Sequence, residues 1–418
     1  MTAMERSLPV WLFVSYGGGH VQALLPVAKR VRELGLAQPV YLALTTAAAV
    51  VRDSGIPTIG FGDLITPDDE RARRKGEELA AQLQVQAAER GESIAYLGLS
   101  YTDMEDRLGQ KAAAECYRQY GRQSFLPLGI LERAIRRWQP AMVVATNSPR
   151  AEQAAIECAR TLGVPSVCLV DLLGIWERNL LARPGYADAV CVLNDAVRDS
   201  LIAAGRAPED VCVTGNPAFD TVLDPAMIAA GAAYRRQAGW DALHVCLYAS
   251  SPEPTSIPGV PGAGDPALPR RIEQALLDAV QANPALALWI RRHPSEAPAA
   301  EAGHPRIRVS PRDMPLHACI HASDEVVVTV STVGVEAGLA GKSVTQVRGS
   351  ILDHLSPYVQ MGVADHELVV DQLRQAYAGI TGRSNLPGDR RDALAPAQSA
   401  TERVVRVIRS VQEYHRVA

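Results

Sequence analysis

The segment of residues 323–347 constrains the fold of this chain more than any other stretch. It holds a β-branched run at 325–330, two hydroxyl residues, a helical stretch at 333–339 that is followed by Gly341, and a second strand-like run from 343. A short β-branched run is typical of a buried strand, and Ser or Thr before a helix can cap its first turn. The segment therefore predicts a β-α-β unit of a parallel sheet.

The start of that helix is a candidate anion site. A strand that leads into a helix N-terminus presents backbone N–H groups and the positive end of the helix dipole, which suit a phosphate. Glu336, about one turn into the helix, could accept hydrogen bonds from the vicinal hydroxyls of a sugar. An ordinary capped β-α-β unit explains the same residues without any ligand. The candidate phosphate contacts are Ser331, Thr332, Val333 and Gly334.

Length and composition set the broad class. At 418 residues the chain is longer than one hydrophobic core usually organises, so we expect two domains. A hydrophobic content of 47% and a charged content of 21% are typical of a soluble globular protein. The net charge of -4 argues against non-specific nucleic-acid binding. The apolar run at 10–14 is too short for a signal peptide or a membrane span, which predicts a cytoplasmic protein.

The cysteines and acidic residues predict no metal site. The seven cysteines are scattered singly, their number is odd, and none forms a C-x-x-C pair. We therefore expect small reduced core residues, neither disulfides nor metal ligands. No D-x-D sequence occurs at a convincing strand end either.

A glycine-rich turn follows the first predicted strand. Residues 10–14 indicate a strand and 21–34 a helix, with Gly18, Gly19 and His20 in the turn between them. Glycines at such a turn let another molecule approach the backbone. The spacing is not G-x-G-x-x-G, which speaks against a dinucleotide site of the usual kind. His20 could polarise or deprotonate a bound hydroxyl, or it could simply cap the helix.

Strands and helices alternate again between about 120 and 217, and this alternation predicts a parallel sheet covered on both faces. In such sheets ligands bind beyond the carboxyl ends of the strands. Gly18, Gly19 and Asn216 are the candidate donor contacts on this edge. The segments expected there together are Gly17 to His20, Thr146 to Arg150, Asp171, and Gly215 with Asn216.

Three stretches break the alternation. Residues 63–120 are charged and helical in composition, as in a lid, an acceptor surface or a solvated helical hairpin. Residues 220–241 indicate the connection between domains. The Pro- and Gly-rich residues 250–269 could be a mobile ligand loop or a disordered connection.

The run Ile290-R-R-H-P294 ends a predicted strand of the second domain. Arg291 and Arg292 could bind a diphosphate, and His293 could donate a hydrogen bond that strengthens as charge develops on the leaving group. Solvated arginines in a surface turn are the alternative. Together with the capped helix at 331–336, the run favours a nucleotide-diphosphate site.

The order of these motifs resembles the two-Rossmann-domain glycosyltransferases called GT-B. The Gly17-G-G-H20 turn resembles the first loop of the N-acetylglucosaminyl transferase of lipid II synthesis. Val213-T-G-N-P217, His293-P294 and the run from Ser331 to Lys342 resemble segments of the non-hydrolysing UDP-N-acetylglucosamine 2-epimerases. The H-P and Ser/Thr motifs are also similar to bacterial sialyltransferases and CDP-glycerol polymer transferases.

The resemblance implies an α/β protein with two doubly wound parallel-sheet domains and a cleft between them. The acceptor would bind to residues 1–222, including the insertion at 63–120. The nucleotide sugar would bind to 240–396, with His293 near the phosphates and Glu336 on the ribose. Residues 397–418 would form a terminal helix.

Two departures from the epimerase pattern favour transfer over epimerisation. The strand that leads into a catalytic G-D-T in the epimerases leads here into Thr146-N-S-P149, and the segment H-V-E-A-G-L-R is matched only loosely, with Asp171 where the glutamate would fall. Epimerisation needs groups on both faces of the reacting carbon. Transfer needs one base, which could be Asp171 or His20.

The sequence therefore predicts a glycosyltransferase that needs no metal or cofactor and uses a UDP- or CMP-linked sugar as its co-substrate. The acceptor would be a glycan, a lipid-linked glycan or a small molecule. A nucleotide-sugar 2-epimerase and a non-catalytic nucleotide-sugar-binding protein are the alternatives. Trp138 and the arginines before it could contact the inner membrane face, although a solvated helix face explains them equally well.

Overall fold

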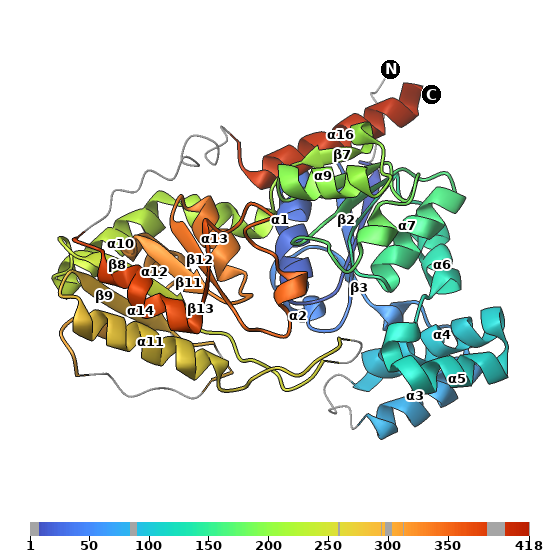
Figure 1. Ribbon diagram of the computed structural model, residues 1–418. Helices are drawn as coiled ribbons and strands as arrows, with labels where there is room; N and C mark the ends of the chain where they lie inside the picture. The colour runs from blue at the N-terminus through green and yellow to red at the C-terminus, as the bar shows by residue number, and fades with distance from the viewer. Residues whose placement is uncertain are drawn as a thin grey trace, which may run out of the picture. The chain divides into compact units, whose positions relative to one another are not determined.

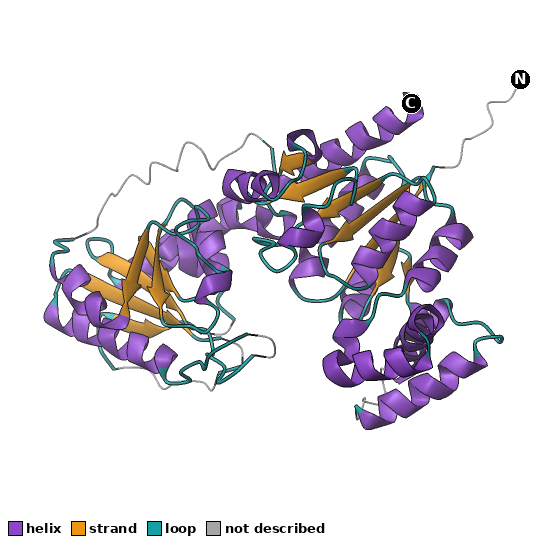
Figure 2. Ribbon diagram, turned by 45° about the vertical axis from the view of Figure 1, so that its right-hand side comes forward, coloured by secondary structure: helices purple, strands orange, loops and turns teal. Residues whose placement is uncertain are grey.

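The computed structural model describes residues 8–83, 90–257, 260–293, 295–296, 303–311, 313–382 and 398–417. The chain forms two compact units (Figure 1), one of Met1–Ala218 with Gln398–Ala418 and the other of Phe219–Ala397. Each unit holds one sheet with helices on both of its faces (Figure 2). No helix in the described ranges has the length and apolar character needed to cross a membrane.

The sheet of the first unit has seven parallel strands in the order β3-β2-β1-β4-β5-β6-β7. Consecutive residues of the interior strand β1, such as Leu12 and Phe13, are fully buried, so both faces of the sheet are covered. The strands are β1 (Val10–Ser15), β2 (Gln38–Ala43), β3 (Thr58–Ile59), β4 (Met142–Thr146), β5 (Ser166–Leu169), β6 (Ala189–Val192) and β7 (Val211–Val213).

The helices of this unit include the last one of the chain. Val404 and Ile408 of that last helix are buried in the same core as Leu24 and Trp11, and Arg403 Nε donates to the carbonyl oxygen of Thr214 at 2.8 Å. The terminal helix is therefore part of the first unit. The helices outside the insertion are α1 (Gly19–Glu33), α2 (Ala47–Asp53), η1 (Phe61–Asp63), η3 (Gly121–Ser124), α6 (Leu128–Trp138), α7 (Ala151–Thr161), α8 (Arg178–Leu181), α9 (Asp195–Ala203), η4 (Pro208–Asp210) and α16 (Ala400–Val417).

The insertion consists of α3 (Glu70–Gln82), α4 (Arg90–Leu108) and α5 (Gln110–Tyr120). Helices α3 and α4 approach closely at Gly98, which has no side chain. A Cβ at this position would lie only 1.9 Å from the carbonyl oxygen of Ala72. Tyr96 of α4 packs edge-on against Phe61 and Phe125. The insertion is thus a packed helical layer, anchored to the first unit by aromatic side chains.

The basic side chains of α6 have protein partners. Arg133 forms an ion pair with Asp69 at 2.6 Å, and Arg137 Nη1 donates to the carbonyl oxygen of Asp63 at 2.7 Å. These contacts tie α6 to the start of the insertion.

The sheet of the second unit has six parallel strands in the order β10-β9-β8-β11-β12-β13. The expected β-α-β unit at 323–347 is confirmed as β11, α13 and β12. The strands are β8 (His244–Ala249), β9 (Leu286–Arg291), β10 (Ile307–Val309), β11 (Glu325–Val328), β12 (Ser343–Arg348) and β13 (His366–Val369). The helices are η5 (Pro217–Leu223), α10 (Pro225–Ala238), α11 (Leu268–Ala282), α12 (Leu316–Ala322), α13 (Val333–Leu339), η6 (Asp353–Leu355) and α14 (Val370–Ala378).

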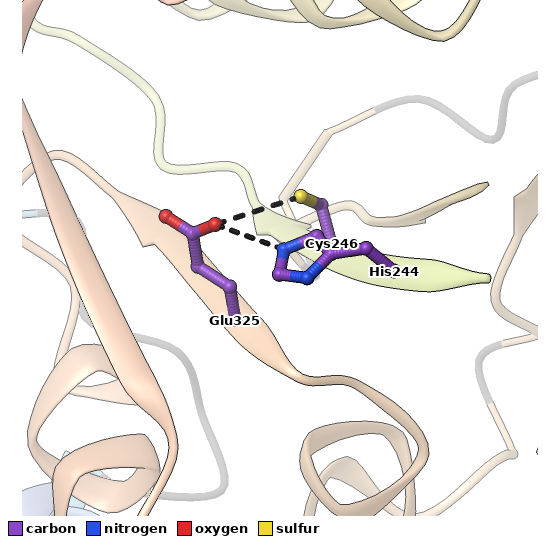
Figure 3. A group of neighbouring side chains, drawn as sticks. All are labelled: His244, Cys246 and Glu325. Carbon is purple, nitrogen blue, oxygen red and sulfur yellow. Dashed lines mark hydrogen bonds and ion pairs between the residues drawn. The ribbon is translucent and has the colours of Figure 1, made fainter. Parts of the chain in front are cut away.

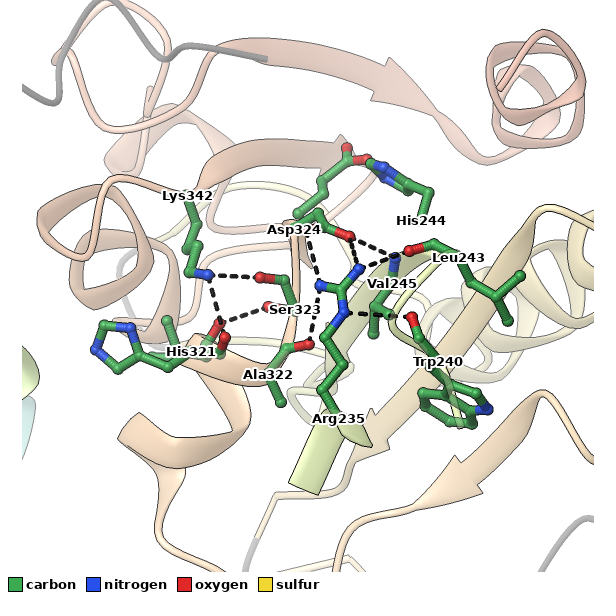
Figure 4. Close-up of polar contacts among 12 residues, drawn as sticks. Arg235, Trp240, Leu243, His244, Val245, His321, Ala322, Ser323, Asp324 and Lys342 are labelled. Atoms are coloured by element: carbon green, nitrogen blue, oxygen red, sulfur yellow. Dashed lines mark hydrogen bonds and ion pairs between the residues drawn. The ribbon is translucent and has the colours of Figure 1, made fainter. Parts of the chain in front are cut away.

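Helix α10 belongs to the second unit instead of forming a free connection at 220–241. Its Arg235 lies 95% buried and forms a two-pronged ion pair with Asp324, at 2.8 and 2.9 Å. The same guanidinium donates to the carbonyl oxygen of Leu243 at 2.6 Å, and Asp324 accepts from the backbone N–H of Val245 at 2.9 Å (Figure 4). A buried charge pair of this kind ties α10 to the starts of β8 and β11.

The Pro- and Gly-rich loop after β8 is anchored at its start. The Glu253 carboxylate, 8% exposed, accepts from the Ser350 hydroxyl and from the backbone N–H of Ile351, both at 2.7 Å. These bonds hold the loop against the segment that follows β12. Residues 258 and 259 of the loop lie outside the described ranges.

Candidate functional site

The turn after β1 requires glycine at two positions. Gly18 has a φ of 66°, in the left-handed region that favours glycine. A Cβ at Gly17 would lie 1.9 Å from the hydroxyl oxygen of Thr46, so only glycine lets the turn approach the start of α2. Gly18 and Gly19 are exposed, and their backbone is therefore accessible to a ligand.

His20 and Asp171 lie side by side at the carboxyl edge of this sheet. His20 Nδ1 and Asp171 Oδ2 are 3.9 Å apart, with side chains 25% and 18% exposed. This separation is within ion-pair range but too long for a hydrogen bond. In the described part of the chain, His20 Nδ1 has no hydrogen-bond partner.

Asparagines from two other strand ends hold Asp171 in place. The backbone N–H of Asp171 donates to Asn147 Oδ1 at 3.1 Å, and the Asn216 side-chain amide donates to the Asp171 carbonyl oxygen. Residues that follow β1, β4, β5 and β7 therefore meet at one edge, as predicted. Asn216 contacts the backbone beside the candidate base, whereas the sequence predicts that it contacts the donor.

A buried carboxyl group that the sequence prediction missed lies beneath this edge. Glu152, in the first turn of α7, is fully buried. Its Oε1 accepts from the backbone N–H of Tyr16 at 2.8 Å and from the Thr146 hydroxyl at 3.2 Å. Its Oε2 has no partner among the described residues. Burial raises the pKa of Glu152 to about 8, although its hydrogen bonds oppose the rise.

A second partly buried carboxyl group lies at the same edge. Glu177 Oε2 accepts from the Asn147 side-chain amide at 3.3 Å. Burial raises the pKa of Glu177, and the nearby charge of Asp171 adds to the rise. Asn147 Oδ1 also accepts from the backbone N–H of Asp171, so one asparagine links Glu177 to the segment that carries Asp171.

A small cavity adjoins the turn. It has a volume of about 160 Å³ and is lined by Thr45, Tyr96 and Arg122 among others. Tyr96 hydrogen-bonds the hydroxyl of Tyr16 at 2.8 Å, which places α4 of the insertion next to the glycine-rich turn. Thr45 adopts a φ of 54°, a strained conformation for a β-branched residue. The insertion therefore helps to shape the space beside the turn.

In the second unit, both arginines of the Ile290-R-R-H run have protein partners. Arg291 Nη1 donates to the carbonyl oxygens of Met314 at 2.6 Å and Pro311 at 3.3 Å. Arg292 forms an ion pair with Glu273 at 2.7 Å. The sequence predicts that these guanidinium groups bind phosphate, but in this structure they order the surrounding loop and α11. A phosphate would have to share or displace these contacts.

His293 is exposed, and its ring is oriented by its neighbours. Its Nδ1 accepts from the backbone N–H of Ser295 at 3.2 Å and lies 2.7 Å from the Ser295 hydroxyl. Its own backbone N–H donates to Glu296 Oε2 at 2.8 Å, and Glu296 Oε1 accepts from the Ser250 hydroxyl at 3.0 Å. Because Nδ1 accepts, we assign the ring proton to Nε2, which suits donation to a phosphate oxygen.

The turn that leads into α13 is stabilised by hydrogen bonds between its own residues. The Ser331 hydroxyl accepts from the backbone N–H of Val333 at 3.3 Å, and the N–H of Gly334 donates to the Ser331 carbonyl oxygen at 3.0 Å. A Cβ at Gly334 would lie 3.0 Å from a methyl group of Val328, so glycine lets the helix pack close to β11. Thr332 is exposed beside this turn. Part of the predicted phosphate cradle is thus already hydrogen-bonded within the turn.

Glu336 faces a histidine that the sequence prediction did not single out. Its Oε2 lies 2.7 Å from His317 Nε2, and His317 Nδ1 lies 3.3 Å from the Thr221 hydroxyl. Glu336 is only 7% exposed. A ribose would therefore meet a coupled carboxylate and imidazole instead of a free carboxylate. No motif in the sequence connects these three residues, which come from η5, α12 and α13.

His293 and Ser331 follow strands that end at the same sheet edge. Since β8 lies between β9 and β11 and all three are parallel, the two strand ends are separated by about two strand spacings, roughly 10 Å. That spacing leaves room for one diphosphate to be contacted from both sides.

Several solved structures are similar to this chain over almost its whole length. MurG from Acinetobacter baumannii matches with a TM-score of 0.57 at 16% identity, over 96% of this chain and 100% of that one. A UDP-GlcNAc 2-epimerase from Neisseria meningitidis, bound to UDP-GlcNAc, matches with 0.54 at 12% identity, also over 96% and 100%. MnaA of S. aureus, solved with UDP, matches with 0.54 at 15% identity over 98% of each chain. No protein-family model matches, and no curated protein matches significantly.

Two parallel-sheet units and these full-length matches decide the architecture. The chain has the GT-B fold. In this GT-B chain, the first unit carries the glycine-rich turn with His20 and Asp171, and the second carries the carboxyl edge with His293 and Glu336. One fold can host different activities, so the function of this chain depends on these side chains.

Proposed function

We propose that this protein is a metal-independent glycosyltransferase that takes a nucleotide sugar as donor. The second unit binds the donor, with His293 and the turn at Ser331 at the diphosphate and Glu336 at the ribose. The first unit binds the acceptor at the glycine-rich turn and the neighbouring cavity. The GT-B fold and the transferases and epimerases among its structural neighbours support this proposal.

The pair of His20 and Asp171 carries the proposal. Their 3.9 Å separation leaves His20 Nδ1 without a hydrogen bond among the described residues. A hydroxyl oxygen placed between them could donate its proton to one group while remaining in contact with the other, each at about 2.8 Å. One of the two acts as the base that removes the acceptor proton, and the other stabilises the charge that results.

Donor chemistry requires that the negative charge on the departing diphosphate be stabilised. The Nε2–H of His293 supplies a hydrogen bond that strengthens as that charge develops, and the positive end of the α13 dipole favours the same charge. Transfer that persists in EDTA would support the metal-independent form of the proposal, and full loss with recovery on adding Mg²⁺ would refute it.

The decisive experiment measures transfer with Asp171→Asn and His20→Ala. We expect each variant to bind donor normally in thermal-shift titrations with UDP and CMP nucleotides and to lose about 10² to 10⁴ in kcat. Glu33→Gln, a change on the exposed face of α1, is the matched control. Transfer at the wild-type rate in both site variants would refute the assignment.

Nucleotide-sugar 2-epimerisation is the second candidate, and one geometric observation favours it. The Glu177 carboxylate and the Asp171 backbone N–H both contact Asn147, so a second acidic residue accompanies Asp171 at the edge where the epimerase pattern lacks one acid. Incubation with UDP-N-acetylglucosamine alone separates the two functions. A new sugar or released UDP without any acceptor would favour epimerisation, whereas binding without any turnover would favour a sensor protein.

A further inference from the structure

A compact group of metal-binding side chains lies in the second unit, at the edge of the sheet opposite to the proposed donor site. His244 and Cys246 begin β8 and Glu325 begins β11, so the group lies at the amino ends of the strands. Cys246 and Glu325 are direct neighbours in the strand register. His244, Cys246 and Glu325 are 2%, 3% and 7% exposed. Figure 3 shows the three side chains converging from the two strands.

The distances between the three potential ligand atoms match a tetrahedral site. Glu325 Oε2 lies 3.2 Å from His244 Nε2 and 3.9 Å from Cys246 Sγ. One ligand atom from each residue lies within 4.8 Å of the others. With Zn–N and Zn–O bonds of about 2.1 Å and a Zn–S bond of about 2.3 Å, the ligand atoms of a tetrahedral site are separated by roughly 3.4 to 3.6 Å. A cation could therefore be bound with only small movements.

The second oxygen of Glu325 is held separately. Its Oε1 accepts from the Thr345 hydroxyl and, at 3.0 Å, from the Tyr377 hydroxyl. These two bonds orient the carboxylate so that Oε2 faces His244 and Cys246. Outer partners of this kind are a regular feature of metal sites, where they fix the orientation of the ligand.

A cavity gives access to the group. It has a volume of about 770 Å³ and is lined by His244, Glu325, Thr345, Tyr377 and His366 among others. A water molecule from this cavity could complete a fourth coordination position. Two anionic ligands, a thiolate and a carboxylate, would neutralise a divalent cation, so the buried site would carry no net charge.

We propose that His244, Cys246 and Glu325 bind one divalent cation of the zinc class, with a water as fourth ligand. On binding, the Cys246 thiol releases its proton to solvent, and His244 binds through Nε2 with its ring proton on Nδ1. The metal bonds replace the hydrogen bonds to Glu325 Oε2 and join β8 to β11. Within the second unit, the site lies at the opposite sheet edge from His293 and Ser331, and the proposal differs from the sequence-based expectation that no cysteine binds metal.

Cobalt is the probe for this site. The full chain is stripped with a chelator and titrated with Co²⁺, and thiolate-to-cobalt charge-transfer absorption is followed in the near ultraviolet. We expect one equivalent to bind with this band, and Zn²⁺ to displace it. Cys246→Ser should abolish the band and weaken binding by about 100-fold or more, beyond the effect of losing an outer partner. Serine keeps a hydroxyl near Glu325, which favours a folded variant.

Two further variants complete the test. Tyr377→Phe removes one bond to Glu325 Oε1, and it should keep the band but bind Co²⁺ about 10-fold more weakly. Cys191→Ser is the matched control, since Cys191 is equally buried on β6 of the first unit. It should titrate like the wild type. Absence of the band in the wild type, or its persistence in Cys246→Ser, would overturn the proposal and leave a hydrogen-bonded buried carboxylate.

Discussion

Glu152→Gln should change how the stability of the protein depends on pH. Burial raises the pKa of Glu152 from 4.5 to about 8 in the folded state. At a pH between these two pKa values, Glu152 therefore keeps its proton in the folded protein but has lost it in the unfolded chain. Stability contributed by this group is present below about pH 4.5 and is lost as the pH rises through about 8. Glutamine, which does not titrate, removes this loss.

The magnitude follows from the shift. The pKa of Glu152 rises from 4.5 to about 8 on folding. At about 1.4 kcal/mol per pKa unit, this shift corresponds to a destabilisation of the wild type of roughly 5 kcal/mol at high pH. Between about pH 5 and pH 8 we expect the free energy of unfolding of the wild type to fall by about 3.5 kcal/mol relative to Glu152→Gln. The glutamine amide takes the place of Oε2, which has no hydrogen-bond partner among the described residues. Any cost of burying that amide is independent of pH and leaves the slope unchanged.

Urea unfolding, followed by circular dichroism at several pH values, measures this difference. Glu157→Gln, a change to a partly exposed carboxylate on the same helix, is the control and should show a much smaller change with pH. A difference between wild type and Glu152→Gln that stays constant across this range would show that Glu152 is solvated or ionised, and the burial argument would fail. Since Glu152 is protonated near neutral pH, the variant should also keep the turn at Tyr16 intact.

Three other perturbations test the packing and the donor site. Arg235→Ala should destabilise the protein by about 3 to 5 kcal/mol in thermal or urea unfolding, because it removes the guanidinium that balances the buried charge of Asp324; a loss below about 1 kcal/mol would contradict this. Gly98→Ala should destabilise the protein by more than about 2 kcal/mol through its clash with α3, while Gly91→Ala, which faces open space on the same helix, should be neutral or stabilising. Glu336→Gln should raise the donor KM at least tenfold, and an unchanged KM would remove it from the donor site.

The residues at the carboxyl edge of the first unit's sheet could be predicted because they follow from short-range patterns in the sequence. Each strand is a short apolar run, and the residue types that follow it can be read directly from the sequence. Parallel strands place their carboxyl ends at one edge, so His20 and Asp171 had to lie on that edge once the sheet was inferred. Their 3.9 Å separation required the structure.

The donor residues show the limit of the same reasoning. The run of Arg291, Arg292 and His293 indicates a cationic strand end, and the structure does place it there. Whether those charges are available depends on neighbours that are remote in sequence. Arg291 is bonded to Met314, 23 residues away, and Arg292 to Glu273, 19 residues away. Local composition carries no information about such partners.

By itself, the sequence determined the alternation of strands and helices, the β-α-β unit at 323–347, and the residues that follow each strand, because hydrophobic period and turn chemistry act over a few residues. Only the tertiary structure decided which polar groups are buried and which meet. It placed Glu152 beneath the glycine-rich turn, Glu336 against His317, and His244 beside Glu325. Burial and hydrogen bonding depend on surfaces brought together by the whole chain, which no short stretch encodes.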